Sequence, residues 1–284
     1  MAEVFGFPVD NESPEAKRYR RLRLCPFNNR VPNCTKDKAE NPLGVCSVFD
    51  GSNIVSICPV RFRADWLIAE DAASFFFDQD AKWTSLTEVR LNDGLGKSAG
   101  NIDVVIAAYN SEGAVVDFGS LEVQAVYISG NIRRPFEAFM ADSDKGAQFD
   151  WKGQKGYPAP DFVSSSRKRL APQLMFKGGI LHAWKKRMAV ALDKALFETL
   201  PDIKEVTRDH AEVAWLNYDF DYDEDHRLVN MVRYRTVYAT FHDSLDTITK
   251  PVVGPVDKFI EQLQTKLDNK LSPPDAPVLD AADI

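Results

Sequence analysis

Two apolar runs separated by a four-residue turn place the strongest constraint on how this chain folds. Residues 102–109 and 114–128 are rich in valine, isoleucine and leucine, and residues 110–113 between them read Asn-Ser-Glu-Gly. Two such runs joined by a short polar turn predict a β-hairpin. Asp103 stands near the start of the first run, and Glu122 and Gln124 stand inside the second. The predicted hairpin therefore carries acids within apolar strands.

The pairing of the two strands decides whether these acids meet. Folding about the centre of the turn places Asp103 opposite Ser120, and a bulge at Gly119-Ser120 would bring Glu122 beside Asp103. Glu122 and Gln124 are two residues apart, so both side chains point to one face of the strand. Such a carboxylate pair suits Mg²⁺, which takes hard oxygen ligands and keeps positions for water and phosphate. Because this spacing recurs by chance, acids that merely face solvent at strand ends are the alternative interpretation.

All four cysteines, Cys25, Cys34, Cys46 and Cys58, lie within one short segment with the spacing C-x8-C-x11-C-x11-C. Disulfides are disfavoured in a cytoplasmic protein, so a tetrahedral four-thiolate metal site is the favoured interpretation. The turns Cys25-Pro26-Phe27 and Cys58-Pro59-Val60 resemble metal knuckles, in which backbone amides and a thiolate face the metal. Iron and zinc suit four thiolates equally well. Free buried thiols, disulfides and redox chemistry remain open.

Composition limits the class of protein. A chain of 284 residues can form one large domain, or a core domain with an elaboration. It has no apolar run near the roughly 18 residues of a membrane helix and no secretory signal, which predicts a cytoplasmic protein with no membrane partner. The net charge of -7 counts mildly against nucleic acid, but the basic residues are clustered. The clusters are residues 17–23, 133–134, 167–169 and 185–187.

The rest of the chain gives a mixed order of helices and strands. Strand 84–91 would carry Glu88 on the same face as Leu86 and Arg90. The expected elements are an N-terminal arm at 1–14, a basic helix or extended segment at 14–24, helix 68–81, strand 84–91, a glycine-rich loop at 92–100, helix 134–140, a long loop at 148–166, a mostly helical stretch at 170–200 interrupted near Gly178-Gly179, strands 205–220 and 228–241, helix 255–270 and a disordered tail at 272–284.

Other familiar motifs are not supported. Gly94-Leu95-Gly96-Lys97-Ser98 lacks the first glycine of a phosphate loop, because position 91 is Leu91, and a strand rather than a helix follows it. The four histidines form no metal-spaced pair, and there is no G-x-S-x-G elbow.

Several phrases resemble one known family. Leu24-Cys25-Pro26-Phe27-Asn28, Val31-Pro32-Asn33-Cys34-Thr35-Lys36 and Pro42-Leu43-Gly44-Val45-Cys46-Ser47 look like the cysteine region of NotI-type restriction endonucleases. Gly100-Asn101-Ile102-Asp103 and Leu121-Glu122-Val123-Gln124 look like that family's variant of the PD-(D/E)XK nuclease core, in which Gln replaces the usual Lys. The match is strongest over residues 22–141. The chain is compact for the family, which leaves the length of its DNA site open.

The resemblance implies an α/β fold of the α+β kind, with a PD-(D/E)XK core of mixed sheet flanked by helices and a small N-terminal four-cysteine metal-binding element. It implies Mg²⁺ on Asp103 and Glu122, Gln124 in the Lys position, Glu88 as the upstream acid, and a structural iron, or zinc, on the four cysteines. It also implies a homodimer that makes double-strand breaks at a GC-rich palindrome, with a cognate DNA methyltransferase as the system partner. The domains would be 1–65 for the arm and the four-cysteine element, 66–271 for the nuclease core and 272–284 for the tail.

Reading G·C pairs requires donors to guanine O6 and N7, usually from Arg or Lys, and acceptors for cytosine N4. The candidates are Arg133, Arg134, Gln154, Lys155, Arg167, Lys168 and Arg169. A structure-specific repair or recombination nuclease of the same superfamily and a non-enzymatic metal-thiolate protein are the alternative functions.

Overall fold

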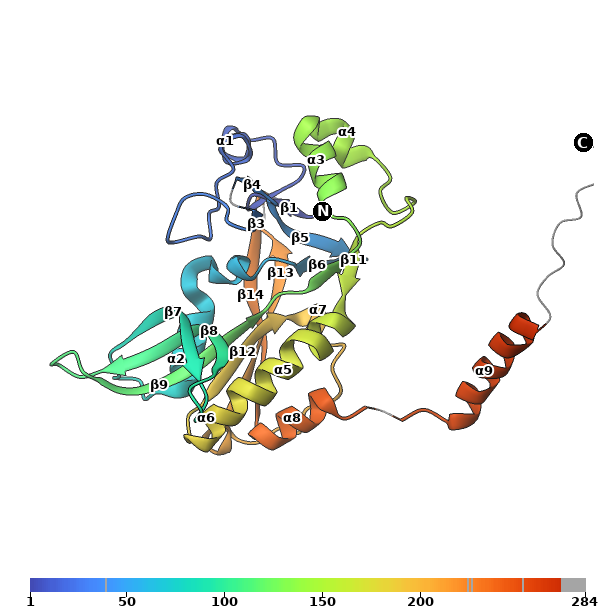
Figure 1. Cartoon of the computed structure of the whole chain (residues 1–284). Coiled ribbons are helices and arrows are strands. Elements are labelled where there is room, and N and C mark those ends of the chain that lie inside the picture. The colour runs from blue at the N-terminus through green and yellow to red at the C-terminus, as the bar shows by residue number, and fades with distance from the viewer. Residues whose placement is uncertain (39, 224, 226, 252, 272–284) are drawn as a thin grey trace, which may run out of the picture. The chain divides into compact units, whose positions relative to one another are not determined.

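A six-stranded mixed sheet forms the centre of the computed structural model, which describes residues 1–38, 40–223, 225, 227–251 and 253–271 (Figure 1). The chain divides into two compact units, Met1–Thr249 and Lys250–Ile284, and the sheet belongs to the first. Its strand order is β14-β13-β12-β9-β8-β7. The strands are β7 (Trp83–Asn92), β8 (Ser98–Tyr109), β9 (Val115–Gln124), β12 (Met188–Asp193), β13 (Val213–Tyr222) and β14 (Val229–Ala239).

The direction of the strands divides the sheet into two halves. β7, β8 and β9 form an antiparallel meander, whereas β12 runs parallel to both β9 and β13. β14 returns antiparallel along β13. A parallel neighbour requires a crossover connection, and the chain between β9 and β12 includes a long helix over one face of the sheet.

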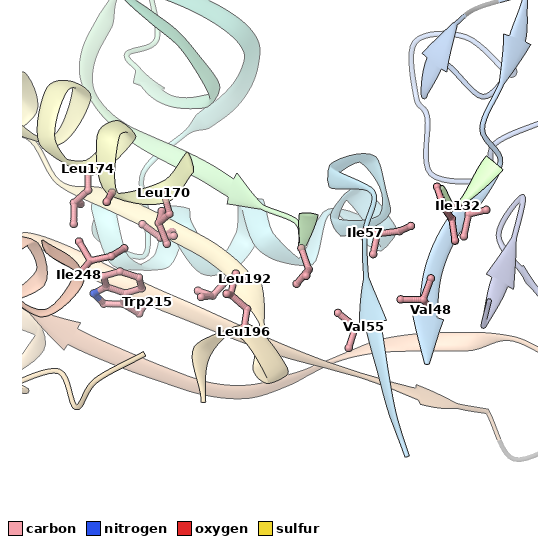
Figure 2. Packing of buried hydrophobic residues seen from close by; sticks show 14 of the residues in the cluster. Val48, Val55, Ile57, Ile132, Leu170, Leu174, Leu192, Leu196, Trp215 and Ile248 are labelled. Carbon is pink, nitrogen blue, oxygen red and sulfur yellow. The ribbon is translucent and has the colours of Figure 1, made fainter. Parts of the chain in front are cut away.

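This helix is continuous from residue 164 to residue 183, and we call it the site helix. It has alternating π- and α-helical turns: η2 (Ser164–Leu170), α5 (Ala171–Gln173), η3 (Leu174–Gly178) and α6 (Gly179–Ala183). Leu170 and Leu174 pack above Trp215, and Ile248 of α8 (Phe241–Thr249) lies beside that ring (Figure 2). The indole Nε1 of Trp215 donates to Ser244 Oγ at 3.1 Å.

Helix α2 (Leu67–Phe76) covers the opposite face of the sheet. Strand β12 is buried on both faces and divides its side chains between them. Met188, Val190 and Leu192 belong to the core under the site helix, whereas Ala189 and Ala191 belong to the core under α2. Gly119 of β9 allows α2 to approach, because a Cβ at that position would lie 2.5 Å from the Phe76 ring.

The N-terminal residues form a second sheet with the order β2-β1-β5-β6, from β1 (Glu3–Val4), β2 (Phe7–Pro8), β5 (Val45–Asp50) and β6 (Asn53–Ser56). It shares the core under the site helix, and Asp193 ties it to β12 because Ser56 N donates to Asp193 Oδ2 at 2.8 Å. Glu3 and Arg61 form a buried ion pair there at 3.1 Å.

The remaining elements of the first unit are short. They are α1 (Pro14–Leu22), β3 (Asp37–Lys38), β4 (Asn41–Pro42), η1 (Pro59–Trp66), β10 (Tyr127–Ser129), α3 (Arg133–Ala141), α4 (Ser143–Gln148), β11 (Ala159–Asp161), α7 (Lys194–Phe197) and η4 (Arg208–His210). The second unit contains α9 (Val256–Leu271), which has no buried residue. Within the described residues, no helix combines the length and the hydropathy needed to cross a membrane.

Many elements predicted from the sequence are confirmed. The hairpin of β8 and β9, strand 84–91, strand 228–241 and helices 134–140 and 255–270 form close to their expected bounds. Helix 68–81 forms but ends at Phe76, and residues 14–24 begin as a helix capped by Ser13, whose Oγ accepts from Ala16 N at 3.2 Å. The predicted tail at 272–284 lies outside the described residues.

The prediction of a mostly helical stretch at 170–200 was wrong in two respects. Residues 188–193 form strand β12, and its side chains are buried on both faces, so the sequence shows no period of two that would distinguish a strand from a buried helix. The expected interruption near Gly178-Gly179 is also wrong, because both residues have helical dihedral angles.

The other corrections concern loops and ends. The prediction of an N-terminal arm at 1–14 is wrong, because Ala2, Val4 and Phe5 are buried in the N-terminal sheet. Loop 92–100 is shorter, since β8 begins at Ser98, and loop 148–166 contains β11 and the start of the site helix. Strand 114–128 is two strands, β9 and β10, and strand 205–220 begins only at Val213.

Candidate functional site

Three carboxylates, Glu88, Asp103 and Glu122, lie in one row across β7, β8 and β9, and we call them the carboxylate row. Thr87 pairs with Val104 and Val89 with Ile102, so Glu88 stands opposite Asp103. Val104 pairs with Leu121, and the same register places Asp103 opposite Glu122. The sequence prediction that Asp103 and Glu122 meet is confirmed, but the predicted bulge at Gly119-Ser120 is wrong. The register shifts instead beside the turn, between Ala108 and Tyr109.

Asp103 is oriented by the backbone of the neighbouring strand. Its Oδ2 accepts from Val123 N at 2.9 Å, and its carboxylate lies beside that of Glu122. Burial raises the pKa of Asp103, and the charge of Glu88 raises it further, whereas the bond from Val123 N and the charge of Lys177 oppose the rise.

Glu122 is fully buried, on the face of β9 that the site helix covers. Burial, followed by the charge of Asp103, raises the pKa of Glu122 to about 8, against the opposing effect of Lys177. Lys177 Nζ donates to Glu122 Oε2 at 2.6 Å, whereas Oε1 is buried with no hydrogen-bond partner. A buried acceptor without a partner costs folding free energy, and this oxygen is available to a ligand atom.

Gln124 shares the face of Glu122 and is also buried. Its Nε2 donates to Ala125 O at 2.6 Å, which fixes the amide and leaves its oxygen able to accept a hydrogen bond.

Glu88 has an unusual backbone conformation. Its φ is +59°, in the left-handed region, in the middle of a strand. For a residue with a side chain this conformation costs of the order of 1 kcal/mol, and such strain concentrates at functional sites. The side chain is exposed at the open end of the row.

The donor set of the row suits a hard divalent cation. Mg²⁺ is commonly held by one or two carboxylates and completes its shell with water and phosphate oxygens. The Asp103–Glu122 pair offers two carboxylates and one unsatisfied oxygen, which fits this requirement. Among the described residues no three His, Cys, Asp or Glu side chains form a preassembled metal-binding group, so the pair rather than the whole row provides the fit.

Lys177 is the residue of this site that the sequence analysis missed. It lies on the buried side of the site helix with Leu170, Leu174 and Leu181, and it is itself buried. The available signal was a lysine inside an otherwise apolar helical stripe. Leu170, Leu174, Lys177 and Leu181 follow one another at spacings of four, three and four residues, which places them on one face of a helix. Its partner 55 positions away could not be identified from that pattern.

The four cysteines come from separate elements of the N-terminal region, and we call them the cysteine cluster, although among the described residues they do not form a preassembled metal-binding group. Cys25 and Cys34 lie in the segment after α1, Cys46 lies in β5, and Cys58 precedes η1. All four are free, and all except Cys25 are buried, so the disulfide alternative is not supported.

The surroundings of the cluster suit metal-bound thiolates. Burial raises the pKa of Cys25 to about 11 and also raises those of Cys34 and Cys46, and negative charge on Cys58 raises all three further. Backbone amides of Phe27 and Asn28 face Cys25, and that of Lys36 faces Cys34, as in metal knuckles. A cation that neutralises the thiolates would remove the cost of ionising them together.

The candidate DNA-contacting residues fall into two groups. Arg134, Gln154, Lys155, Arg167, Lys168 and Arg169 are exposed. Arg133 is instead half-buried and pairs with Asp37 at 2.5 Å. Within the exposed group, Arg169 lies over the Tyr127 ring at 4.6 Å.

Comparison with known proteins gives one match. The family model described as restriction endonuclease NotI matches residues 13–231, which include the cysteine cluster, the carboxylate row, Gln124 and Lys177. No curated protein matches the chain.

Proposed function

Because the chain belongs to the NotI restriction endonuclease family and is a type II site-specific deoxyribonuclease, we propose that it hydrolyses both strands of a GC-rich palindrome at a Mg²⁺ site on Asp103 and Glu122. The observation that carries this proposal is the buried carboxylate pair, in which Glu122 Oε1 has no partner within the protein. The family match removes the support for a non-enzymatic metal-thiolate protein.

The fold supports a PD-(D/E)XK core. The acids lie on adjacent strands of an antiparallel meander, and a helical crossover leads from β9 to the parallel strand β12. We propose that these elements are the nuclease core and that Glu88 is its upstream acid.

Each residue of the site has a separate role in this mechanism. Asp103 and Glu122 would hold the cation, which would supply Lewis-acid polarisation of the scissile phosphate and lower the pKa of water. Gln124 orients the attacking water through its amide oxygen, because its nitrogen is already held by Ala125 O. The neutral amide can position water, but it can neither act as a base nor supply charge.

Recognition of DNA is assigned to exposed basic and amide side chains near the site helix. Arg167, Lys168 and Arg169 lie on the first turns of that helix, and Gln154 and Lys155 lie in the preceding loop. Arginine and lysine donate to guanine O6 and N7 in the major groove. Arg134 joins this group, and we assign Arg133 a supporting role because it is paired with Asp37.

Three further parts of the proposal concern assembly and structural metal. A palindrome is cut on both strands most simply by a homodimer with one site per strand. A cognate methyltransferase would protect host DNA at the same sequence. The cysteine cluster would hold a structural iron or zinc. Metal analysis of the protein distinguishes the two ions, and thiolate-to-iron charge-transfer bands in the absorption spectrum would indicate iron.

The test is digestion of a long DNA of known sequence with Mg²⁺, followed by sequencing of the ends. Discrete ends at one GC-rich palindrome are expected from the wild-type protein, and no cleavage is expected from Asp103→Ala, which should still bind the DNA. Nicking that follows DNA structure rather than sequence would favour the repair nuclease, and an active Asp103→Ala protein would rule out the site.

A further inference from the structure

A buried lysine contacts the candidate metal-binding pair from a distant element. Lys177 Nζ lies 2.6 Å from Glu122 Oε2, and both side chains are almost completely excluded from solvent, at 6% and 0% exposure. The other oxygen of Glu122 has no partner. Lys177 therefore occupies one side of this carboxylate and leaves the second side free.

The surrounding structure makes room for this contact. Gly100 of β8 has a φ of +105°, and a Cβ there would lie 3.4 Å from Lys177 Cε, so the stem of the lysine passes over a strand position without a side chain. Gly178 lets the site helix pack closely on α8 and β12, because a Cβ there would lie 2.9 Å from the Phe241 ring and 3.4 Å from Met188 Sδ. The π-helical turn η3 carries Lys177, and π-helical turns within α-helices often mark functional sites.

The side chains around Glu122 on the sheet are acidic or neutral. The row contains three acids, and the next side chain on the face of Glu122 is the neutral amide of Gln124. Positions 122 and 124 are about 7 Å apart along the strand. Lys177 brings a positive charge to the same carboxylate from the helix side.

We propose that Lys177 is a positioning residue of the nuclease site, which holds Glu122 Oε2 so that Oε1 faces the cation and supplies the positive charge that Gln124 lacks. This inference rests on the proposed Mg²⁺ site at Asp103 and Glu122. The competing interpretations are a structural ion pair and a lysine that merely fills the place of the cation.

Four variants separate these interpretations. Lys177→Met removes the charge and keeps the length of the stem, and Lys177→Gln keeps a donor for Glu122 without the charge. The double variant Lys177→Met/Gln124→Lys returns the charge from β9. Lys194→Met is the matched control, because Lys194 Nζ also pairs with a carboxylate, Asp219 Oδ2, at 2.8 Å, but away from the row.

Single-turnover cleavage at saturating Mg²⁺ and calorimetric Ca²⁺ binding are the two readouts. We expect Lys177→Met to cut about 100-fold more slowly, the cost of a misplaced catalytic group, and to bind Ca²⁺ more weakly because Glu122 loses its orientation. The double variant should regain at least about tenfold in rate, since a preorganised charge is restored. Lys177→Gln should bind Ca²⁺ more tightly than Lys177→Met but cut slowly, and Lys194→Met should match the wild type.

Three results would overturn the inference. They are a wild-type rate in Lys177→Met, tighter Ca²⁺ binding in that variant, and a double variant no faster than Lys177→Met. If Lys177→Met does not fold, Lys177→Gln decides, and a wild-type rate there refutes the role. Failure of the proposed function looks different, because then the wild-type protein does not cut or Asp103→Ala remains active.

Discussion

At the scale of single residues, the site collects groups whose environments cost folding free energy. Glu122 and Lys177 are ionisable groups in the interior, and Glu88 holds a left-handed backbone conformation within a strand. Each of these features lowers the free energy of unfolding by an amount large enough to measure in a single-residue variant. Functional sites are where such costs are expected, because the arrangement is selected for chemistry rather than for stability.

Replacing Glu88 by glycine should separate stability from activity. Glycine adopts a φ of +59° without steric cost, so Glu88→Gly is expected to raise the free energy of unfolding by about 1 kcal/mol and to slow cleavage by removing the acid. Urea denaturation and single-turnover cleavage measure the two effects. Glu88→Gln is the control, since it removes the charge but keeps the strain. Equal stability of the glycine and glutamine variants would contradict the strain at this position.

Asp193 should make stability depend on pH. Burial raises its pKa to about 7 from the ordinary value of 3.8, despite hydrogen bonds from Ser56 N and Ala195 N. The folded protein therefore binds more protons than the unfolded chain between these values, and the contribution of Asp193 to stability falls as pH rises through this window. The stability difference between wild type and Asp193→Asn should fall by about 2 kcal/mol from pH 5 to pH 7, as measured by urea denaturation. A difference independent of pH would refute the raised pKa.

At the scale of elements, the distance between the site helix and the sheet sets the reach of Lys177. The helix is held close to β12 at Gly178, whereas the adjacent Gly179 has open space around it, with only Phe241 Cζ at 4.0 Å. The two glycines have the same helical dihedral angles, so they differ in packing rather than in backbone conformation.

Alanine at these two positions should have opposite effects. Gly178→Ala is expected to lower the free energy of unfolding by about 1–3 kcal/mol, because the new methyl group overlaps Phe241. Gly179→Ala should raise it by up to about 1 kcal/mol through helix propensity. Thermal denaturation of both variants measures the contrast. Equal shifts in the same direction would show that the site helix does not pack closely against Phe241 of α8 at Gly178.

At the scale of the whole molecule, the first unit combines two sheets over a shared core. Val4, Val45, Val48, Val55 and Ile57 of the N-terminal region pack in the same cluster as residues of the site helix and β12. Under our proposal, a metal at the cysteine cluster would therefore be linked to the packing of the N-terminal sheet, which contains Cys46. The second unit has its own contacts, and α9 is exposed along its whole length.

Removal of the second unit should leave the stability of the first unchanged. A protein ending at Thr249 is expected to keep its Tm within about 2 °C of the full chain, because the main core clusters of the described residues lie within Met1–Thr249. Deletion of residues 1–12 is the contrasting variant and should lower the Tm, because Ala2, Val4 and Phe5 are buried. Calorimetry measures both. A Tm lowered by more than about 5 °C in the shorter protein would show that the second unit stabilises the first.

Local sequence was sufficient to predict an element wherever its pattern of apolar and polar residues repeats over a few positions. The hairpin of β8 and β9 followed from two apolar runs and a polar turn, but the turn alone placed Asp103 opposite Ser120 rather than Glu122. Strand β12 could not be identified in this way, because a strand buried on both faces has no polar alternation. Strands β1 and β2 were missed because each is only two residues long, and β1 is held by pairing with the distant strand β5.

The sequence by itself determined the family, the acids and the hairpin that joins them, because each depends on residue types at short spacings. Only the tertiary structure decided the register that aligns Glu88, Asp103 and Glu122, and the approach of Lys177 to Glu122. Register depends on where a bulge forms, and the lysine contact depends on how a crossover helix packs on a sheet. Both are set by long-range packing, which no local pattern of residues encodes.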